Sequence, residues 1–277
     1  MKLVDVMGLE YSRSKKWFNW TIGLSLTIQL LTILSIFLVS GAGLKMLAAI
    51  AAFGQIVLFF CRRGSKYHFG LAEEIRRLAM LQDGLNIQPS EDQMASIWER
   101  VGDPNAAKPF YLGPYYESES PKSHKRLIEI TRESAFFTTS LARKSAIAFG
   151  IMAGLGLAAT MGAFIAVVQA GTFQQNLDMV SKAVVASMVF WVTGDLMTMA
   201  LQFYSLAKTA GRVQTQCAHL LSKSTGIKDE AHTIAGEYNC SLVQAPPIPD
   251  WIYKWRQDIL NEAWKNRRAP ASSSNAT

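Results

Sequence analysis

The sequence predicts an all-α, polytopic membrane protein with four transmembrane helices in two hairpins and a cytoplasmic helical layer. Three observations predict this fold class: two pairs of apolar segments, a long charged insert between the pairs, and a basic tail. Residues 17–44 carry no charge and residues 46–61 follow a single lysine, while residues 145–177 and 183–207 are interrupted only by Asp195. A hydrocarbon core about 30 Å thick needs about 20 helical residues, so all but the second segment are long enough without flanking residues.

The distribution of lysine and arginine predicts the orientation of these helices. Of the 28 basic residues, only Lys45 and Lys182 fall in the two hairpin turns. Basic residues near helix ends stay on the cytoplasmic side, so both termini and the insert are expected in the cytoplasm. The net charge of +7 arises from these cytoplasmic flanks, and we expect no nucleic-acid partner.

Four regions follow from this division of the chain. They are an N-terminal segment with transmembrane helices 1 and 2 (residues 1–61), a cytoplasmic helical insert (62–144), transmembrane helices 3 and 4 (145–207) and a cytoplasmic helical tail (208–277).

The insert is expected to fold as helices that continue the membrane segments. Apolar residues at helical spacing extend the second membrane helix over residues 67–85, with its end at Gly84. Ser90 followed by Gln93 predicts a capping box and a short helix to about residue 101. Residues 123–144 predict an amphipathic helix that runs directly into the third membrane helix.

The tail is expected to end in an aromatic helix. The proline-rich residues 245–249 stop the preceding helical region, and Asp250 is in position to cap a helix that extends to about residue 268. Trp251, Trp255 and Trp264 give this helix aromatic surface on more than one side. Docking on the insert or on a neighbouring protomer, or contact with the membrane interface, would use that surface.

The expected functional residues lie on a polar stripe inside the membrane segments. Asp195 lies near the middle of an apolar segment, where an ionised carboxylate needs protein or water around it. The residues expected to face inward with it are Ser187, Thr198 and Gln202 on the same helix, Ser25 and Gln29 on the first helix and Gln55 on the second.

Two interpretations of this stripe stay open. In the first, Asp195 is protonated or hydrogen-bonded to Gln29, Gln55 or a hydroxyl and fixes the register of the helices. In the second, stripes from several protomers line a conduction path in which Asp195 favours cations.

A second stripe, made of small residues, predicts close helix packing. It occupies every fourth position of the third membrane helix and includes Gly150, Gly154, Ala158, Gly162 and Ala166. Small residues allow another backbone to approach closely, within the protomer or between protomers.

Basic pairs beside the membrane have a simpler expected role than those farther away. Arg62 and Arg63 are expected to set topology and contact lipid head groups. The pairs farther from the membrane are candidates for binding a phosphate ligand, with solvated helix surface as the alternative. These are Arg76, Arg77, Lys125 and Arg126.

No enzyme signature, cofactor motif or metal module is found in the sequence. There is no phosphate-binding glycine loop with lysine, no nucleophile elbow and no paired metal ligands at the spacing of a zinc module. We therefore expect no enzymatic activity, no cofactor and no metal.

The layout and two short motifs carry a resemblance to a known family. Residues 11–16, Tyr-Ser-Arg-Ser-Lys-Lys, lead into the first membrane helix, and residues 249–253, Pro-Asp-Trp-Ile-Tyr, lie near the end. In these features the chain resembles the SMODS-associating four-transmembrane effectors of bacterial antiphage defence. The resemblance implies a bacterial inner-membrane protein that forms homo-oligomers and responds to a nucleotide second messenger or a soluble defence partner.

The sequence thus leaves three hypotheses for function. The first is an oligomeric channel or pore-forming effector gated through its cytoplasmic helices. The second is a non-conducting membrane scaffold or sensor that recruits a soluble partner. The third is a small-solute transporter, which is disfavoured because the two hairpins show no internal repeat.

Overall fold

The fold is helical throughout the part of the chain that is described. The computed structural model describes residues 2–38, 42–103, 106–107, 115–169, 176–223 and 227–268. These residues form seven helices and no strand, which confirms the all-α prediction. The helices are α1 (Leu3–Leu38), α2 (Ala42–Leu85), α3 (Glu91–Val101), α4 (His124–Gln169), α5 (Asn176–Ser222), α6 (Ile227–Gln244) and α7 (Asp250–Arg268).

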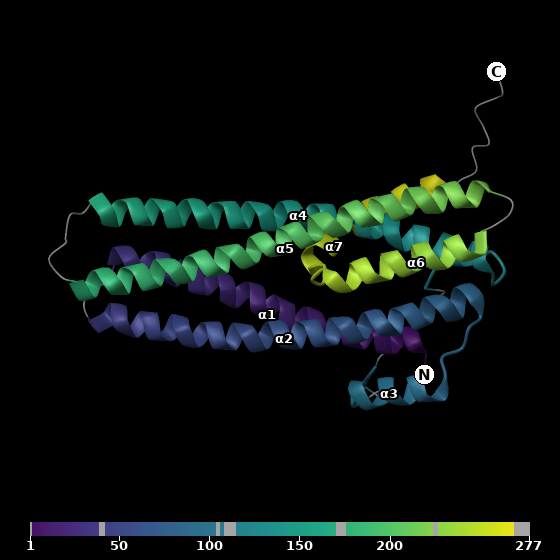
Figure 1. Ribbon diagram of the computed structural model, residues 1–277, viewed down its shortest axis with the longest axis horizontal. Coiled ribbons are helices and arrows are strands. Elements are labelled where there is room, and N and C mark those ends of the chain that lie inside the picture. Colours follow the sequence, from purple (N-terminus) through teal and green to yellow (C-terminus); the bar gives the residue numbers. More distant parts are fainter. Residues whose placement is uncertain are drawn as a thin grey trace, which may run out of the picture.

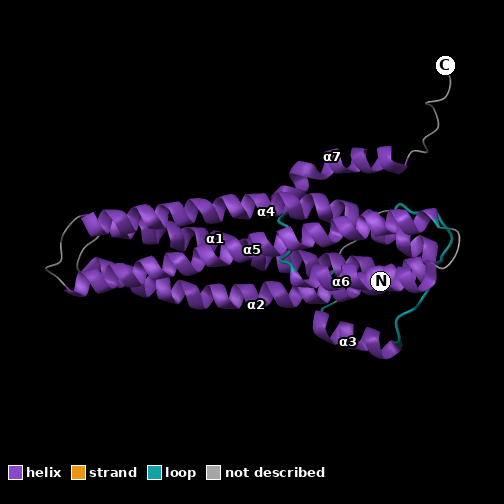
Figure 2. Cartoon of the chain, turned by 45° about the horizontal axis from the view of Figure 1, so that its top comes forward, coloured by secondary structure: helices purple, strands orange, loops and turns teal. Residues whose placement is uncertain are grey.

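Four long helices form two antiparallel hairpins that lie side by side. Figure 1 shows α1 with α2 and α4 with α5, and both hairpins turn at the same end of the molecule. The N-terminus, α3 and α6 lie at the opposite end. Figure 2 shows α7 alongside α4 and α3 beside the end of α2.

Three helices run without a break from one half of the molecule into the other. Helices α2, α4 and α5 contain 44, 46 and 47 residues, so each is roughly 65–70 Å long. The predicted continuation of the apolar segments as unbroken helices is confirmed. The cytoplasmic position of the extensions stays a prediction. The expected region boundaries after residues 61, 144 and 207 therefore lie inside continuous helices.

The half of the bundle near the hairpin turns has an apolar outer surface. Large apolar side chains are exposed there on all four long helices, among them Leu30, Phe53, Leu155 and Leu201. By length and composition, one described stretch, His124–Ala159 in α4, could cross a membrane. The four crossings as such stay a prediction.

The opposite half has its own packed core. Helix α3 begins with the predicted capping box, in which Ser90 and Gln93 each bind the backbone of the other. Its buried Ile97 and Val101 pack in a cluster with Val6 of α1 and Ile75 of α2. Helix α3 is thereby held against the first hairpin.

Helices α6 and α7 cover the second hairpin. The hydroxyl of Tyr238 on α6 lies 2.8 Å from Ser134 Oγ and 2.7 Å from Thr138 Oγ1 on α4. On α7, Ile252 and Trp264 are buried in a cluster with Phe136 of α4. The docking interpretation of the tail thus applies to one face of α7, within the same chain.

Asp250 has a different role from the predicted one. It is the first residue of α7, and its Oδ1 lies 2.6 Å from Nζ of Lys15 on α1. The backbone carbonyl of Pro249 accepts the first hydrogen bonds of the helix, from the amides of Ile252 and Tyr253. Asp250 therefore joins α7 to the first hairpin through an ion pair.

The end of α2 also differs from the prediction. Helix α2 ends at Leu85, and Asn86 follows with a positive φ of 59°. Its amide donates to the Gln82 carbonyl, and the Ile87 amide donates to the Leu81 carbonyl, so the left-handed residue closes the end of the helix. Gly84 instead lies where α2 meets α4: a Cβ built there would be 3.1 Å from the Cα of Leu127.

Gly84→Ala should therefore lower the free energy of unfolding by about 1–3 kcal/mol, because the added methyl group would press on backbone. Gly70→Ala on the same helix is the matched control, since no described atom lies within 4 Å of a Cβ built there. The control should be neutral or stabilising by up to about 1 kcal/mol, because alanine is the better helix former. Denaturant titration of both variants tests this, and equal effects would refute the close-contact role of Gly84.

Candidate functional site

The candidate site is the polar interior of the apolar half, and its central contact is an ion pair. Oδ2 of Asp195 on α5 lies 2.5 Å from Nη2 of Arg62 on α2. The sequence analysis named only Gln29, Gln55 or a hydroxyl as partners of Asp195, so the structure adds a charged partner that it missed. The long arginine side chain reaches the carboxylate from a neighbouring helix, and both side chains keep partial exposure, 28% for Arg62 and 36% for Asp195.

This contact also changes the role of Arg62. The sequence predicted a topology determinant in contact with lipid head groups, together with Arg63. Arg63 is exposed, whereas the side chain of Arg62 is turned toward Asp195 and is only 28% exposed. The ion pair joins the two hairpins where the second predicted membrane segment ends, because Arg62 follows directly after residue 61.

Donors on the inner face of α2 are buried without hydrogen-bond partners among the described residues. They are Nε2 of Gln55 and both Nε and Nη2 of Arg62, because the contact of Nη2 with Asp195 is an ion pair without hydrogen-bond geometry. Gln55 and Arg62 are seven positions apart and so lie on one helix face. On α1, Ser25 and Gln29 are buried, as the inward-facing stripe predicted. Buried polar groups in proteins are nearly always satisfied by protein or water, so this part of the interior needs further acceptors.

The stripe on α5 faces inward only in part. Leu196 and Phe203 are buried on this helix, and they form the row that packs into the main core with α4. Thr198 is exposed and Gln202 half-buried, because the polar row is rotated away from this apolar row. The side chain of Ser187 lies outside the described residues.

The small-residue stripe on α4 is open in a single chain. No described atom lies within 4 Å of a Cβ built at Gly150, Gly154 or Gly162. Ala158 is exposed, and the side chain of Ala166 lies outside the described residues. Of the two alternatives left by the sequence, packing within the protomer thus finds no support in the described residues.

We expect Gly154→Leu to weaken association between protomers while the fold of the single chain persists. The reason is that the added side chain has room in the chain itself but fills the groove that a second backbone would enter. Cross-linking in native membranes and size-exclusion chromatography in detergent measure this. Gly23→Leu on α1, also open, is the control; unchanged assembly in Gly154→Leu, or equal loss in both, would contradict the use of the groove.

The four basic residues proposed for ligand binding are not gathered into one site. Arg76 is buried, and its Nε and Nη2 bind Glu73 at 2.7 Å and Asn239 at 2.5 Å. Burial alone would lower its pKa, but Glu73 and nearby tyrosines raise the pKa well above its usual value. Arg76 is therefore a structural cation whose donors are already used.

Arg126 is engaged in a similar way. Its Nη2 lies 3.0 Å from each carboxylate oxygen of Asp83, and its other donors bind the backbone carbonyls of Asp83, Ser118 and Ser120. Arg77 and Lys125 are exposed on the surfaces of α2 and α4. For Arg76 and Arg126 the structure thus assigns a packing role, and the alternative of solvated helix surface fits Arg77 and Lys125.

The described part of the chain contains no cluster of side chains that could bind a metal ion. No group of three or more histidine, cysteine, aspartate or glutamate side chains lies together there. Cys217 is buried, which raises the pKa of its thiol to about 12, and Cys240 is exposed.

Taken together, the fold and site define a class: a long double-hairpin helical protein with an apolar outer half and an ion pair between its hairpins. Comparison with known proteins adds no family: no family description, no curated protein and no solved structure matches this chain.

Proposed function

We propose that the four long helices cross a lipid bilayer through the half near the hairpin turns. Exposed apolar side chains on all four helices support this, because a large apolar surface is unfavourable in water and typical of contact with lipid. Trp17 and Trp20 are exposed directly after Lys15 and Lys16, which is the order expected at a cytoplasmic membrane interface.

Within that bilayer the protein acts as an oligomeric ion channel or pore, gated through its cytoplasmic helices. One observation supports this proposal: an ion pair joins the hairpins beside buried donors of Gln55 and Arg62 that have no hydrogen-bond partner among the described residues. Charged residues of membrane helices that face the bundle interior commonly mark ion pathways or proton relays. Water admitted between protomers would satisfy the donors and hydrate the path.

Helix α2 would transmit movements of the cytoplasmic half to the ion pair. Helix α2 is continuous from Arg62 to Arg76, a distance of roughly 20 Å. At Arg76 it is joined to Asn239 of α6, and the neighbouring Tyr238 is joined to α4. A tilt of α2 would therefore break contacts at one end and move Arg62 away from Asp195 at the other.

The test is ion flux through liposomes that contain the purified, full-length protein. Potassium efflux is measured for the unmodified protein and for Asp195→Asn, from pH 5 to pH 8. The channel proposal expects flux that depends on protein density, and an altered rate or pH profile in Asp195→Asn. Normal flux with unchanged pH dependence, accompanied by lower stability only, would assign Asp195 to fixing helix register.

A non-conducting scaffold is the second candidate, and the outer face of α7 favours it. Trp251, Trp255 and Ile259 are exposed at four-residue intervals, outside the buried cluster that α7 forms with α4. A soluble partner could dock on such a row. Protein that assembles in liposomes but passes no ions, with or without a membrane potential, would support the scaffold and overturn the channel.

A place in bacterial antiphage defence is proposed from the resemblance of layout alone. It would require the protein to act on the inner membrane of the cell that makes it. Expression in a bacterium with a membrane-potential dye tests this, with Asp195→Asn as the matched variant. Loss of potential during phage infection in cells with the unmodified protein, and not in cells without it, is the expected result.

A further inference from the structure

Helix α7 begins where the long helices enter the apolar half of the bundle. Oδ1 of Asp250, its first residue, lies 2.6 Å from Nζ of Lys15, and the first predicted membrane segment starts at residue 17. Nζ of Lys144 lies 5.9 Å from the ring centroid of Trp255, and the third predicted segment starts at residue 145. The first turns of α7 are therefore at the predicted boundary between membrane and cytoplasm.

From this boundary α7 runs along α4 away from the hairpin turns. The rings of Trp264 and Phe136 have centroids 5.2 Å apart, whereas Trp255 lies beside Lys144. Later residues of α7 thus meet earlier residues of α4, so the two helices are antiparallel, and Figure 2 shows them side by side. Ile259, about one turn after Trp255, is farther from the boundary. Only the start of α7 can reach a membrane surface.

Indole rings are exposed at this boundary. Trp251 and Trp255 on α7 are 50% and 62% exposed, and Trp17 and Trp20 on α1 are exposed as well. The head-group layer of a bilayer suits such rings, because the apolar body contacts acyl chains while the N–H group stays within reach of polar partners. The start of α7 thus adds two indoles to the aromatic belt expected of a membrane protein.

Side-chain contacts align the four long helices at the same level. Oγ of Ser14 on α1 donates to the carbonyl of Ser65 on α2 at 2.9 Å. The ring of Phe149 on α4 has its centroid 6.2 Å from that of Phe18 on α1 and 5.4 Å from that of Phe203 on α5. Residues within about two turns of these contacts therefore lie at one height along the bundle.

The charged side chains of the long helices at this height are basic or already paired. The nearest acids, Asp195 and Asp250, form ion pairs with Arg62 and Lys15. Residues 11–72, 134–177 and 196–222 contain no aspartate or glutamate. Six basic side chains, named here the basic collar, have no ion-pair partner among the described residues. They are Lys16, Arg63, Lys66, Arg143, Lys144 and Lys208.

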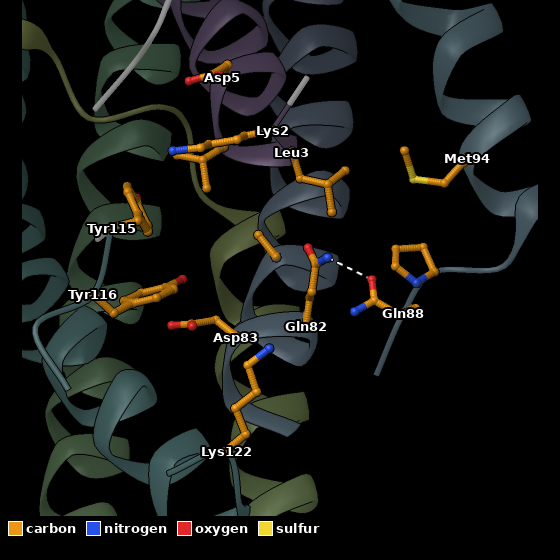
Figure 3. A pocket seen from close by; sticks show the side chains of 13 residues that line it. Lys2, Leu3, Asp5, Gln82, Asp83, Gln88, Met94, Tyr115, Tyr116 and Lys122 are labelled. Atoms are coloured by element: carbon orange, nitrogen blue, oxygen red, sulfur yellow. Dashed lines mark hydrogen bonds between the residues drawn. The ribbon is translucent and has the colours of Figure 1, made fainter. Parts of the chain in front are cut away.

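The far end of the bundle has a different charge pattern. A cavity there is bordered by both signs of charge, Lys2 and Lys122 as well as Asp5 and Asp83, as Figure 3 shows. A surface of mixed sign has no general attraction for an anionic layer, whereas one of a single sign does. The basic collar is therefore a feature of the membrane boundary and not of the cytoplasmic half as a whole.

We propose that the basic collar and the start of α7 bind the head groups of an anionic phospholipid leaflet. Trp251 and Trp255 lie in the head-group layer, and Arg143 and Lys144 beside them pair with lipid phosphates. The inference rests on the proposed bilayer crossing, because lipid has to surround the apolar half. Lipid is the occupant, rather than an acidic soluble protein, because the collar occupies all four long helices where their exposed apolar surface begins.

Anionic lipid would also hold the two hairpins together through α7. The helix is tied to α1 by the pair of Asp250 with Lys15, and to α4 by the buried side chains of Ile252 and Trp264. Lipid bound to its first turns would therefore stabilise contacts of both hairpins at once. The soluble partner of the scaffold alternative would use the same exposed row, but would include Ile259, which lies below the head-group layer.

The first test places the start of α7 relative to lipid. The full chain is reconstituted in liposomes whose phospholipid carries bromine near the head groups, which quenches nearby tryptophan. The emission of one residue is the difference between the unmodified protein and its phenylalanine variant. Trp251→Phe should remove emission that the bromine quenches. Trp264→Phe is the control, because Trp264 is 5% exposed and its emission should escape quenching.

Trp20→Phe reports on the bilayer crossing itself, since Trp20 is exposed inside the first predicted membrane segment. Quenched emission from Trp20 with unquenched emission from Trp251 would overturn the lipid contact of α7 and leave the crossing intact. Unquenched emission from both residues would overturn the crossing and this inference with it.

The second test measures lipid preference. A ligand that binds the folded state raises the midpoint of thermal unfolding, so phosphatidylglycerol added to the full chain in detergent should raise it more than phosphatidylcholine does. Arg143→Gln and Lys144→Gln should each weaken the apparent affinity for phosphatidylglycerol about fivefold. Lys265→Gln, exposed near the other end of α7, is the matched control and should keep the unmodified affinity. Equal stabilisation by the two lipids, or an equal loss in Lys265→Gln, would refute the proposed binding.

Discussion

Replacing Arg76 by alanine should lower the free energy of unfolding by about 3–5 kcal/mol, the largest effect expected of any single change considered for this protein. Glu73, which is 5% exposed, would keep its charge without the guanidinium that lies 2.7 Å away. Asn239 of α6 would lose its partner, and Tyr238 would lose a cation 5.4 Å from its ring centroid. Denaturant titration in detergent measures the loss.

Arg77→Ala is the matched control, because the neighbouring arginine is exposed on the surface of α2. Its effect should stay within about 0.5 kcal/mol. The double variant Glu73→Met with Arg76→Met should recover much of the stability, since replacing a whole buried ion pair by apolar groups is often neutral. A loss in Arg76→Ala as small as that in Arg77→Ala would show that the buried charge is not what holds α2 to α6.

Arg62→Asp should have the second largest effect, because it places a second carboxylate beside Asp195. An unpaired charge in the middle of a membrane helix costs about 2.5–3.5 kcal/mol, and here two like charges would face each other. We expect loss of assembly and of flux together. Size-exclusion chromatography and potassium efflux from liposomes measure the two separately.

Reversal of the pair distinguishes the contact itself from a general effect of charge. Arg62→Asp combined with Asp195→Arg restores one positive and one negative group at the same position. Assembly should return in this double variant, whereas flux should change in ion selectivity if the pair lines the path. Arg63→Asp, one residue further along α2 and exposed, should leave assembly intact. A double variant no better than either single change would argue against the observed pairing.

Much of the helical layout was predictable because its causes are local. Apolar runs, the Ser90 and Gln93 capping box and the stop at the prolines after Gln244 each depend on residues close together in the chain, and all appear as expected. The end of α2 was predicted at Gly84, one residue before the observed end at Leu85, since glycine and asparagine both tolerate positive φ and Asn86 adopts it. Gly84 is needed for a contact with α4 that local sequence does not reveal.

The burial of Arg76 had a signal in the sequence that could have been used. Arg76 lies four positions after Ala72 and three before Ala79, both apolar and buried on α2. At the same spacings Arg77 has the charged Glu73 and the apolar Met80. The apolar neighbours on both sides thus indicate burial of Arg76. This pattern could not supply Asn239 or Tyr238, because these lie on a helix more than 150 positions away in the chain.

By itself the sequence determined that this chain forms long helices in two hairpins, with charge at one end and apolar surface at the other, because helix formation and amphipathic pattern follow from neighbouring residues. Only the tertiary structure decided that Arg62 pairs with Asp195 and that Arg76 is buried while Arg77 is not. Each of these depends on which distant helices meet and at what rotation, and no local pattern in the chain fixes either quantity.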